Sequence, residues 1–329
     1  MAAVVVNYNG AADLPASLGS LASQTEPVAA FVYDSASRDG SAAVVRGFPG
    51  VTWVGLAENR GYGAAANRAI RDTRAPYVLL LNPDVRLEPT FVARLRAFAE
   101  RAPGAGSLTG KLLRVPGPDG ARILDSTGHV LYRNRWATNR GQGERDEGQY
   151  DAMTEVFGVS GAAAFYRRAM LEDVAVEGEV FAEDFFLYFE DLDLDWRARL
   201  RGWRAYYVPE AVGYHARAGK GGRVGHDASI VRHSVKNRIL TVLRNDTVAD
   251  LVRDLPAILP MEALRLCELA WFAPGALLGH LGALRGAPRA LAARRVIQRR
   301  RTVPRAALRP WLCRYPYRAE LRRRRAGSA

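Results

Sequence analysis

The first hundred residues alternate apolar runs with amphipathic stretches, and this alternation constrains the fold more than any other feature of the chain. Four apolar runs are typical of buried strands: 2–6, 28–33, 51–56 and 77–81. Helices are expected between them, at 13–23, 41–47 and 59–71. Strands and helices that alternate at this spacing predict an α/β fold with a mostly parallel sheet flanked by helices. Ligand-binding side chains are then expected at the carboxyl ends of the strands.

The middle of the chain is less regular. Residues 104–150 are rich in Gly, Pro and Arg, and we expect only short strands there. Farther on, the pattern predicts a strand within Val156–Tyr166, around Gly158–Gly161, and a strand over Arg204–Pro209 that ends before His215. A helix is expected between them, from Glu190 to Gly202, with a buried stripe formed by Leu192, Trp196 and Leu200.

After about Ser229 the sequence becomes helical and basic. Four prolines are expected to break these helices: Pro256, Pro260, Pro274 and Pro288. We therefore divide the chain into an α/β domain, residues 1–228, and a helical, Arg-rich C-terminal region, residues 229–329. Its most apolar stretch, Leu269–Leu284, is shorter than the roughly 20 apolar residues of a transmembrane helix, so a buried or interfacial helix is expected.

The net charge of +13 is unevenly distributed. Residues 229–329 hold 21 Lys and Arg against 6 Asp and Glu, whereas residues 1–228 are close to neutral. A basic region on a neutral body favours an anionic partner, either nucleic acid or lipid headgroups. The alternative interpretation is a solvated helical appendage or an oligomer interface.

The cysteine content and the N-terminal residues indicate the cellular compartment. Cys267 and Cys313 form neither a disulfide framework nor a zinc cluster, which fits a reducing compartment. The opening MAAVVVNYNG has no basic start and no long apolar run, so no secretory signal is expected. The sequence thus favours a cytoplasmic location.

Acidic residues crowd an aromatic segment between Asp184 and Trp203. Its sequence is DFFLYFEDLDLDWRARLRGW, and His215 follows a dozen residues later. Carboxylates among aromatic rings are costly to desolvate unless a metal, a cationic partner or a catalytic duty compensates them. The segment is therefore a candidate site.

Other acidic residues follow the predicted strands directly. Asp84 comes after the strand at 77–81, where it could hold a divalent cation or simply cap a turn. Asp34 and Asp39 follow the second strand, where they could bind a nucleobase or ribose, or form an Asx turn and a helix N-cap. The glycines after Asn59 are not followed by a P-loop lysine, and the first loop lacks a dinucleotide fingerprint.

Seven segments taken together resemble the inverting glycosyltransferases of family 2, in particular their rhamnosyltransferase-like branch. They are VVVNYNG at 4–10, YDSASRDGS at 33–41, ENRGYGAAANRAI at 58–70, LLLNPDV at 79–85, GVSGAAAFYRRAML at 158–171, FFLYFEDLDLDWRARLRGW at 185–203 and VPEAVGYH at 208–215. The resemblance covers about two thirds of the chain. It implies a Rossmann-like fold of the GT-A type over residues 1–228.

The resemblance also implies roles for individual residues. Asp191 matches the catalytic base, and Asp84 matches the last acid of a DxD motif that here reads Asn82-Pro83-Asp84. Asp84 and His215 would bind Mg²⁺ or Mn²⁺. The nucleotide-sugar donor would be bound by Asn7, Asp34, Asp39, Asn59, Asn67 and Asp84. The acceptor side would comprise Gly161, Ala162, Glu190, Asp193 and Arg197. Glu190 and Asp193 would flank the base and either orient the acceptor or pair with Arg197, which lies one helical turn after Asp193.

The implied activity is metal-assisted, inverting transfer of a sugar, rhamnose or similar, from a dTDP- or UDP-sugar. The acceptor would be lipid-linked or a polysaccharide, at the inner face of the cell membrane, in cell-envelope synthesis. An anionic membrane surface is the expected partner of the basic region. The sequence leaves open whether the chain also forms a homo-oligomer. The alternative is a nucleic-acid-binding protein that uses the Arg-rich C-terminal arm.

Overall fold

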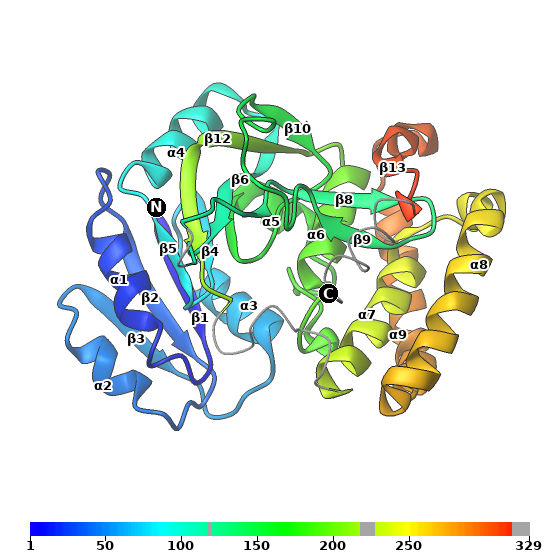
Figure 1. The fold of residues 1–329 in the computed structure, drawn as a ribbon, viewed down its shortest axis with the longest axis horizontal. Coiled ribbons are helices and arrows are strands. Elements are labelled where there is room, and N and C mark those ends of the chain that lie inside the picture. The colour runs from blue at the N-terminus through cyan, green and yellow to red at the C-terminus, as the bar shows by residue number, and fades with distance from the viewer. Residues whose placement is uncertain (118–119, 218–227, 318–329) are drawn as a thin grey trace.

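The expected parallel sheet is present in the computed structural model, which describes residues 1–117, 120–217 and 228–317. One large mixed sheet fills one side of the molecule, and a helical region fills the other (Figure 1). The strands of the sheet follow the order β10-β12-β6-β11-β4-β1-β2-β3, with β5 paired to β12 and β7 to β6. A smaller sheet has the order β13-β8-β9.

The strands are β1 (Ala2–Asn7), β2 (Ala29–Asp34), β3 (Val51–Gly55), β4 (Tyr77–Leu81), β5 (Val85–Leu87), β6 (Ala105–Arg114), β7 (Leu124–Ser126), β8 (His129–Tyr132), β9 (Ala137–Asn139), β10 (Thr154–Val156), β11 (Ala163–Arg167), β12 (Arg204–His215) and β13 (Leu312–Cys313). The helices are α1 (Leu14–Ala22), α2 (Ser41–Arg46), α3 (Tyr62–Asp72), α4 (Phe91–Arg101), α5 (Arg168–Val174), α6 (Glu190–Leu200), α7 (Ala228–Asn245), α8 (Val248–Phe272) and α9 (Leu278–Arg300). Short 3₁₀ helices are η1 (Glu183–Phe185), η2 (Pro274–Leu277) and η3 (Arg305–Trp311).

The first four long strands run parallel and end at a common edge. Asn7 at the end of β1 lies opposite Asp34 at the end of β2, and Val5 lies opposite Leu81 of β4. Strand β11 then enters antiparallel to both β4 and β6. The expected gathering of polar residues at the carboxyl ends of the strands is therefore confirmed.

Helices cover both faces of the sheet and bury a core on each. Side chains of α1, α2 and α4 pack on one face, where Leu14, Leu18 and Leu95 are fully buried. Residues of α3, α5 and α6 pack on the other, where Ala66 and Leu194 are fully buried. In α6 the predicted stripe of Leu192, Trp196 and Leu200 is buried as expected, and the helix stops before Gly202, whose φ is 85°.

Two predictions about strands were wrong. The strand expected within Val156–Tyr166 is interrupted: β10 ends at Val156 and β11 begins at Ala163. Gly158–Gly161 is a loop between them, beside the Asp195 carboxylate, which accepts a hydrogen bond from the Val159 amide at 2.9 Å. Strand β12 continues past Pro209 to include His215, because an irregularity between Val208 and Val212 lets the pairing with β6 resume. In the irregular region, β6 is also longer than expected, with ten residues.

The prolines of the helical region do not all break helices. Only Pro274 stands at an interruption, between α8 and α9. Pro256 and Pro260 lie inside α8, and Pro288 lies inside α9. All three are exposed. Each proline removes one backbone hydrogen bond and crowds the carbonyl group one turn earlier in its own helix, but neither effect ends the helix here.

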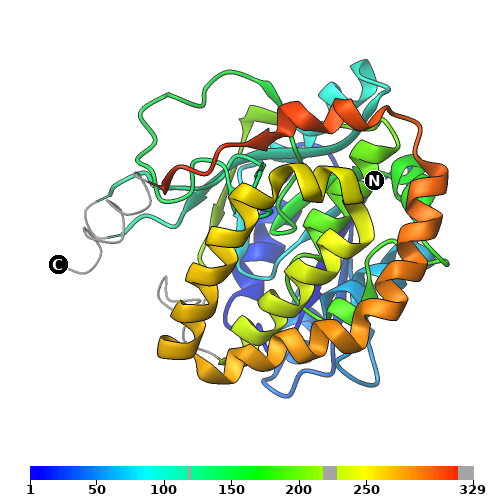
Figure 2. The same cartoon turned by 90° about the vertical axis from the view of Figure 1, so that its right-hand side faces the viewer.

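The helical region is packed against the α/β part of the chain. Helix α7 contacts α6 and η1, α9 lies along α7, and α8 lies on the outside (Figures 1 and 2). The chain then returns through η3 to β13, which pairs with β8. Among the described residues no helix is both long enough and apolar enough to cross a membrane. The arginines at 322–325 lie outside the described residues.

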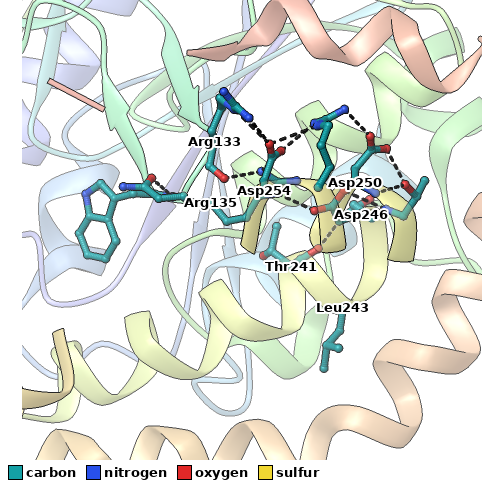
Figure 3. A network of polar contacts seen from close by, with 12 residues as sticks. Arg133, Arg135, Thr241, Leu243, Asp246, Asp250 and Asp254 are labelled. Atoms are coloured by element: carbon teal, nitrogen blue, oxygen red, sulfur yellow. Dashed lines mark hydrogen bonds and ion pairs between the residues drawn. The ribbon is translucent and has the colours of Figure 1, made fainter. Parts of the chain in front are cut away.

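A buried ionic cluster joins the turn after β8 to the junction of α7 and α8 (Figure 3). Arg135 Nε lies 2.5 Å from Asp246 Oδ2, and its Nη1 lies 3.0 Å from Asp254 Oδ2. Arg133 Nη2 lies 2.8 Å from Asp254 Oδ1. Arg135 and both carboxylates are buried. Because breaking a buried pair leaves an uncompensated charge, this cluster fixes the two regions relative to each other.

Candidate active site

Asp84 and His215 meet at the carboxyl end of the parallel strands. Asp84 follows β4, and His215 ends β12, which pairs with β5 just after Asp84. The His215 Nε2 atom lies 3.3 Å from Asp84 Oδ1. Its Nδ1 atom lies 2.8 Å from Asp125 Oδ2, and Arg217 contacts the same carboxylate. The structure thus brings together the two residues predicted to bind metal.

This arrangement fits a divalent cation. Asp125 holds the Nδ1 side of the ring, so Nε2 is directed toward the Asp84 carboxylate and the two donors can reach one ion. Burial disfavours the charged ring, but hydrogen bonds to Asp125 and Asp84 outweigh it and raise the pKa of His215 to about 9. An imidazole that binds a metal gives up this proton.

Two side chains alone do not complete a metal site. Across the described ranges, no group of three or more His, Cys, Asp or Glu side chains is placed to hold an ion. Additional oxygen ligands would therefore come from substrate or water. Asp13 lies near this end of the sheet, and its pKa is raised by burial and by the charge of Asp84.

Asp191, the predicted base, lies in the first turn of α6. Its Oδ2 accepts a hydrogen bond from the Gly161 amide at 2.9 Å, and its Oδ1 accepts one from the Leu192 amide at 2.8 Å. The neighbouring Ala162 carbonyl accepts a hydrogen bond from Asn82 at 2.9 Å. The Gly161–Ala162 segment therefore connects the base to the Asn82-Pro83-Asp84 motif.

A histidine that the sequence reasoning missed lies beside Asp191. His129 Nε2 is 3.6 Å from Asp191 Oδ2, and its Nδ1 is 2.8 Å from Asp195 Oδ2. Burial disfavours the charged ring, but Asp191 and Asp195 outweigh this and raise the pKa of His129. Burial also raises the pKa of Asp195, to about 6. The sequence reasoning gave Asp195 no role, and the structure places it behind His129.

Glu190 is buried next to Asp191. Its Oε2 atom has no hydrogen-bond partner among the described residues. Burial, and secondarily the charge of Asp191, raise the pKa of Glu190 to about 8. Glu190 therefore carries a proton at neutral pH, and one charge of the adjacent carboxylate pair is removed.

Of the two roles expected for Asp193, orienting the acceptor or pairing with Arg197, the structure shows the pairing. Asp193 is 0% exposed, and Arg197 Nε donates to its Oδ2 at 2.9 Å, which is the pairing expected from their spacing. The other carboxylate oxygen accepts hydrogen bonds from Arg244 at 2.8 Å and Asn245 at 2.7 Å, both in α7. Because the pair is buried and bonded within the protein, it attaches α6 to α7 and presents no group to a substrate.

The loop before α6 has an unusual backbone. Phe186, Tyr188 and Phe189 have φ values of 66°, 69° and 71°, which bulky residues rarely adopt. One side chain from α7 holds this loop: the amide nitrogen of Asn237 lies 2.8 Å from the carbonyl oxygens of Phe185, Leu187 and Tyr188. Strained backbone of this kind persists where surrounding contacts over-determine it.

The predicted donor residues at the ends of β1 and β2 lie together. Asn7 Nδ2 donates to Asp34 Oδ1 at 2.7 Å, and the Ser37 amide donates to Asp34 Oδ2 at 2.9 Å. Asp39 accepts a hydrogen bond from Ala11 at 2.8 Å; burial raises its pKa slightly, but hydrogen bonds, led by that from Ser41, outweigh this and lower it. Their nucleotide roles stay predictions.

The other two predicted donor residues, Asn59 and Asn67, differ in exposure to solvent. Asn59 is partly exposed and accepts a hydrogen bond from Gly61 at 2.9 Å. Asn67 is buried, donates to Phe181 at 2.9 Å, and accepts from the amides of Val180 and Phe181. Its amide holds that segment through these bonds, and its nucleotide role stays a prediction.

Comparison with known proteins gives one family and several relatives. A family model described as Glycosyl transferase family 2 matches residues 2–175. The chain is 34% identical over 247 residues to the N-acetylglucosaminyl-diphospho-decaprenol L-rhamnosyltransferase of Mycobacterium tuberculosis (strain CDC 1551 / Oshkosh), covering 67% of this chain and 77% of that protein.

Two solved structures show the same fold. The mannosyltransferase PcManGT from Pyrobaculum calidifontis, in complex with GDP-Man and Mn²⁺, matches with a TM-score of 0.54 at 20% identity, over 90% of this chain and 86% of that chain. Residues 1–349 of S. aureus TarS, in complex with UDP-GlcNAc, match with a TM-score of 0.56 at 16% identity, over 91% and 90% of the chains.

Proposed function

Because this chain belongs to glycosyl transferase family 2, we propose that it transfers rhamnose or a similar sugar from a dTDP- or UDP-linked donor to a lipid-linked acceptor. The chain is a nucleotide-sugar-dependent glycosyltransferase with the GT-A fold. The identity to the mycobacterial rhamnosyltransferase supports a role in cell-envelope glycosyl transfer, with a decaprenyl-diphosphate-linked sugar as the class of acceptor. The comparisons give no support to the nucleic-acid-binding alternative.

The observation that carries the proposal is the meeting of Asp84 and His215 at 3.3 Å. These side chains would hold Mg²⁺ or Mn²⁺, which when bound neutralises charge on the nucleotide diphosphate. The mannosyltransferase of similar fold is a complex with Mn²⁺, which supports a divalent cation here without choosing between the two. Asn7, Asp34, Asp39 and Asn59 would bind the nucleoside.

Asp191 would act as the base on the opposite, acceptor side. The acceptor oxygen forms a bond to the anomeric carbon as the bond to the diphosphate breaks, and the hydroxyl proton passes to the Asp191 carboxylate. Attack from the face opposite the diphosphate inverts the anomeric configuration. The amides of Gly161 and Leu192 orient the carboxylate, and His129 stabilises its charge.

The expected location is the inner face of the cell membrane. A lipid-linked acceptor would require contact with a bilayer, and the basic C-terminal region supports an anionic surface as partner. An oligomer stays a prediction that the described residues do not address.

The experiment that tests the proposal is a panel of nucleotide sugars with Mg²⁺ or Mn²⁺ and a polyprenyl-diphosphate-linked acceptor, with nucleotide release and product formation measured. We expect turnover of a rhamnose donor, loss of activity on chelation, and recovery when metal is added back. The Asp191→Asn variant should bind donor normally but lose at least a hundredfold in kcat, because general-base catalysis contributes about 10²–10⁴-fold.

The control is Glu100→Gln, which changes a carboxylate paired with Arg96 on the surface and should leave kcat unchanged. If no donor is bound or turned over, and Asp84→Ala changes nothing, the proposed function is wrong. Normal kcat in the Asp191→Asn variant would remove this residue from the base role while leaving the donor assignment intact.

A further inference from the structure

The outward face of α8 is apolar throughout. The helix lies farthest from the large sheet (Figure 1) and crosses the face that Figure 2 turns toward the viewer. The structure describes α8 from end to end, and its charged side chains are buried or only partly exposed, Arg253 being the most exposed at 32%. A stripe of exposed residues recurs at helical spacing: Val248, Val252, Leu255, Leu259 and Leu266. A surface helix in contact with water alone normally shows the reverse pattern.

The charged residues of α8 are held in ion pairs, several of them with residues of other elements. Asp254 binds Arg133 and Arg135, Glu262 binds Arg238 of α7 at 2.6 Å, and Arg265 binds Glu268 at 2.8 Å. The amphipathic helix thus buries its polar side in the protein and exposes its apolar side. Such an arrangement needs a second apolar phase over the exposed side.

The apolar surface continues from the end of α8 to the start of α9. Trp271 and Phe272 are 82% and 79% exposed at the end of α8, and Leu278, Leu281 and Leu284 are exposed at the start of α9. We call the exposed side of α8 together with these five residues the docking face. An exposed tryptophan beside a phenylalanine is typical of segments that enter the interfacial layer of a bilayer.

Positive charge borders the docking face. Helix α9 contains six arginines and no acidic residue. Arg285 is exposed and directly follows Leu284, and Arg289 and Arg295 are exposed farther along the helix, where Arg289 is paired with Glu179 at 2.6 Å. Arginines beside an apolar surface match anionic lipid headgroups over an acyl layer. A second copy of the chain carries the same net charge of +13, so charge complementarity favours an anionic lipid surface over self-association.

We propose that the docking face lies in the interfacial layer of an anionic membrane, with α8 parallel to the bilayer plane and Trp271 and Phe272 inserted. This inference deepens the proposed function by naming the surface that brings the enzyme to its acceptor, and it rests on that function only for the acceptor's lipid nature.

Vesicle co-sedimentation of the full chain tests the proposal. We expect the protein to sediment with vesicles of phosphatidylcholine and phosphatidylglycerol, less with phosphatidylcholine alone, and less as salt is raised. The double variant Trp271→Glu/Phe272→Glu should lower the partition coefficient at least tenfold. Both side chains are exposed, so folding should not suffer. The matched control is Val115→Glu/Met153→Glu, which places two charges on exposed apolar residues elsewhere and should bind as wild type.

Three results would overturn the proposal. They are absence of binding to anionic vesicles, equal binding by wild type and the Trp271→Glu/Phe272→Glu variant, and a lipid-free dimer that this variant converts to monomer. Sedimentation equilibrium without lipid measures the last. Binding is measured without turnover, so a failure here is separable from a failure of the proposed function. The variant should keep wild-type kcat with a short-chain, water-soluble acceptor and lose activity on an acceptor embedded in vesicles.

Discussion

At the scale of single residues, α6 opens with two adjacent acids in different surroundings. Asp191 accepts hydrogen bonds from two backbone amides, whereas Glu190 is buried and its pKa is raised to about 8 by burial and by the charge of Asp191. A carboxyl group with a raised folded-state pKa holds its proton in the folded state at pH values where the unfolded chain has released it. The free energy of unfolding therefore depends on pH.

We expect the contribution of Glu190 to stability to be greatest below its ordinary pKa of 4.5 and to fall as the pH rises to about 8. The Glu190→Gln variant should not show this loss, because its amide does not titrate. The free energy of unfolding of wild type minus that of the variant should fall by roughly 2–4 kcal/mol between about pH 5 and about pH 8.5. Urea denaturation measures it.

The exposed Glu58 provides the control, because Glu58→Gln changes the same functional group outside the core. Its urea curves should track those of wild type at both pH values. A wild-type difference from Glu190→Gln that does not change with pH would contradict the expected protonation of Glu190.

His129 connects Asp191 to Asp195 behind it. We expect Asp195→Asn to lower kcat by about ten- to a hundredfold, because a hydrogen bond to a charged group is worth about 1.5–3 kcal/mol. Donor Kd should not change. Loss of the Asp195 charge lowers the pKa of His129, so the alkaline limb of the kcat–pH profile should move to lower pH.

The control is Asp173→Asn, which alters an ion pair with Arg201. A lower kcat with an unmoved profile would give Asp195 a purely structural role.

At the scale of elements, the loop before α6 depends on α7. The three left-handed residues Phe186, Tyr188 and Phe189 lead directly into Glu190 and Asp191, and Asn237 holds three carbonyl groups of the loop. Each such residue stores about 1–3 kcal/mol of strain. The position of the base is therefore set by a helix outside the segment that matches the family model.

We expect Asn237→Ala to lower both stability and kcat. The variant leaves buried carbonyl groups without their shared donor, at a cost of about 1–3 kcal/mol, and lets the loop relax. Donor Kd should stay near the wild-type value, because the donor residues lie on other elements. The control is Ser234→Ala, one turn earlier in α7, whose hydroxyl bonds within its own helix. Wild-type kcat in Asn237→Ala would show that the loop keeps its shape unaided.

Sequence reasoning predicted best what is local. The apolar runs located β1 to β4, and residues directly after those strands, such as Asp34 and Asp84, could be placed at one edge of the sheet because parallel strands share that edge. His129 could not be placed beside Asp191, because that contact joins segments about sixty residues apart. Asn67 and Asp193 carry the same functional groups as ligand-binding residues, and only burial distinguishes them.

At the scale of the whole molecule, the ionic cluster around Arg135 attaches the helical region to the turn after β8 (Figure 3). We expect Arg135→Met to lower the free energy of unfolding by about 3–5 kcal/mol, because Asp246 loses its buried partner and Asp254 loses one of its partners. Urea denaturation monitored by far-UV circular dichroism measures the change.

A double variant gives the internal check. Combining Arg135→Met with Asp246→Asn should cost less than the sum of the two single changes, because the second removes the charge that the first leaves uncompensated. The control is Arg122→Met, more than half exposed and paired with Asp146, which should change stability by no more than about 1 kcal/mol. Additive costs in the double variant would contradict a shared cluster.

The contacts of α7 with the base loop also limit how enzymes of this kind can be recombined. Asn237 bonds the loop before α6, and Arg244 and Asn245 bond Asp193 within α6. A chimera that joins residues 1–228 to the helical region of another glycosyltransferase would leave those carbonyl and carboxylate groups buried without their donors. The practical crossover point for exchanging the rest of the helical region therefore lies after α7, so that this helix is kept together with the loop and the helix α6 that it contacts.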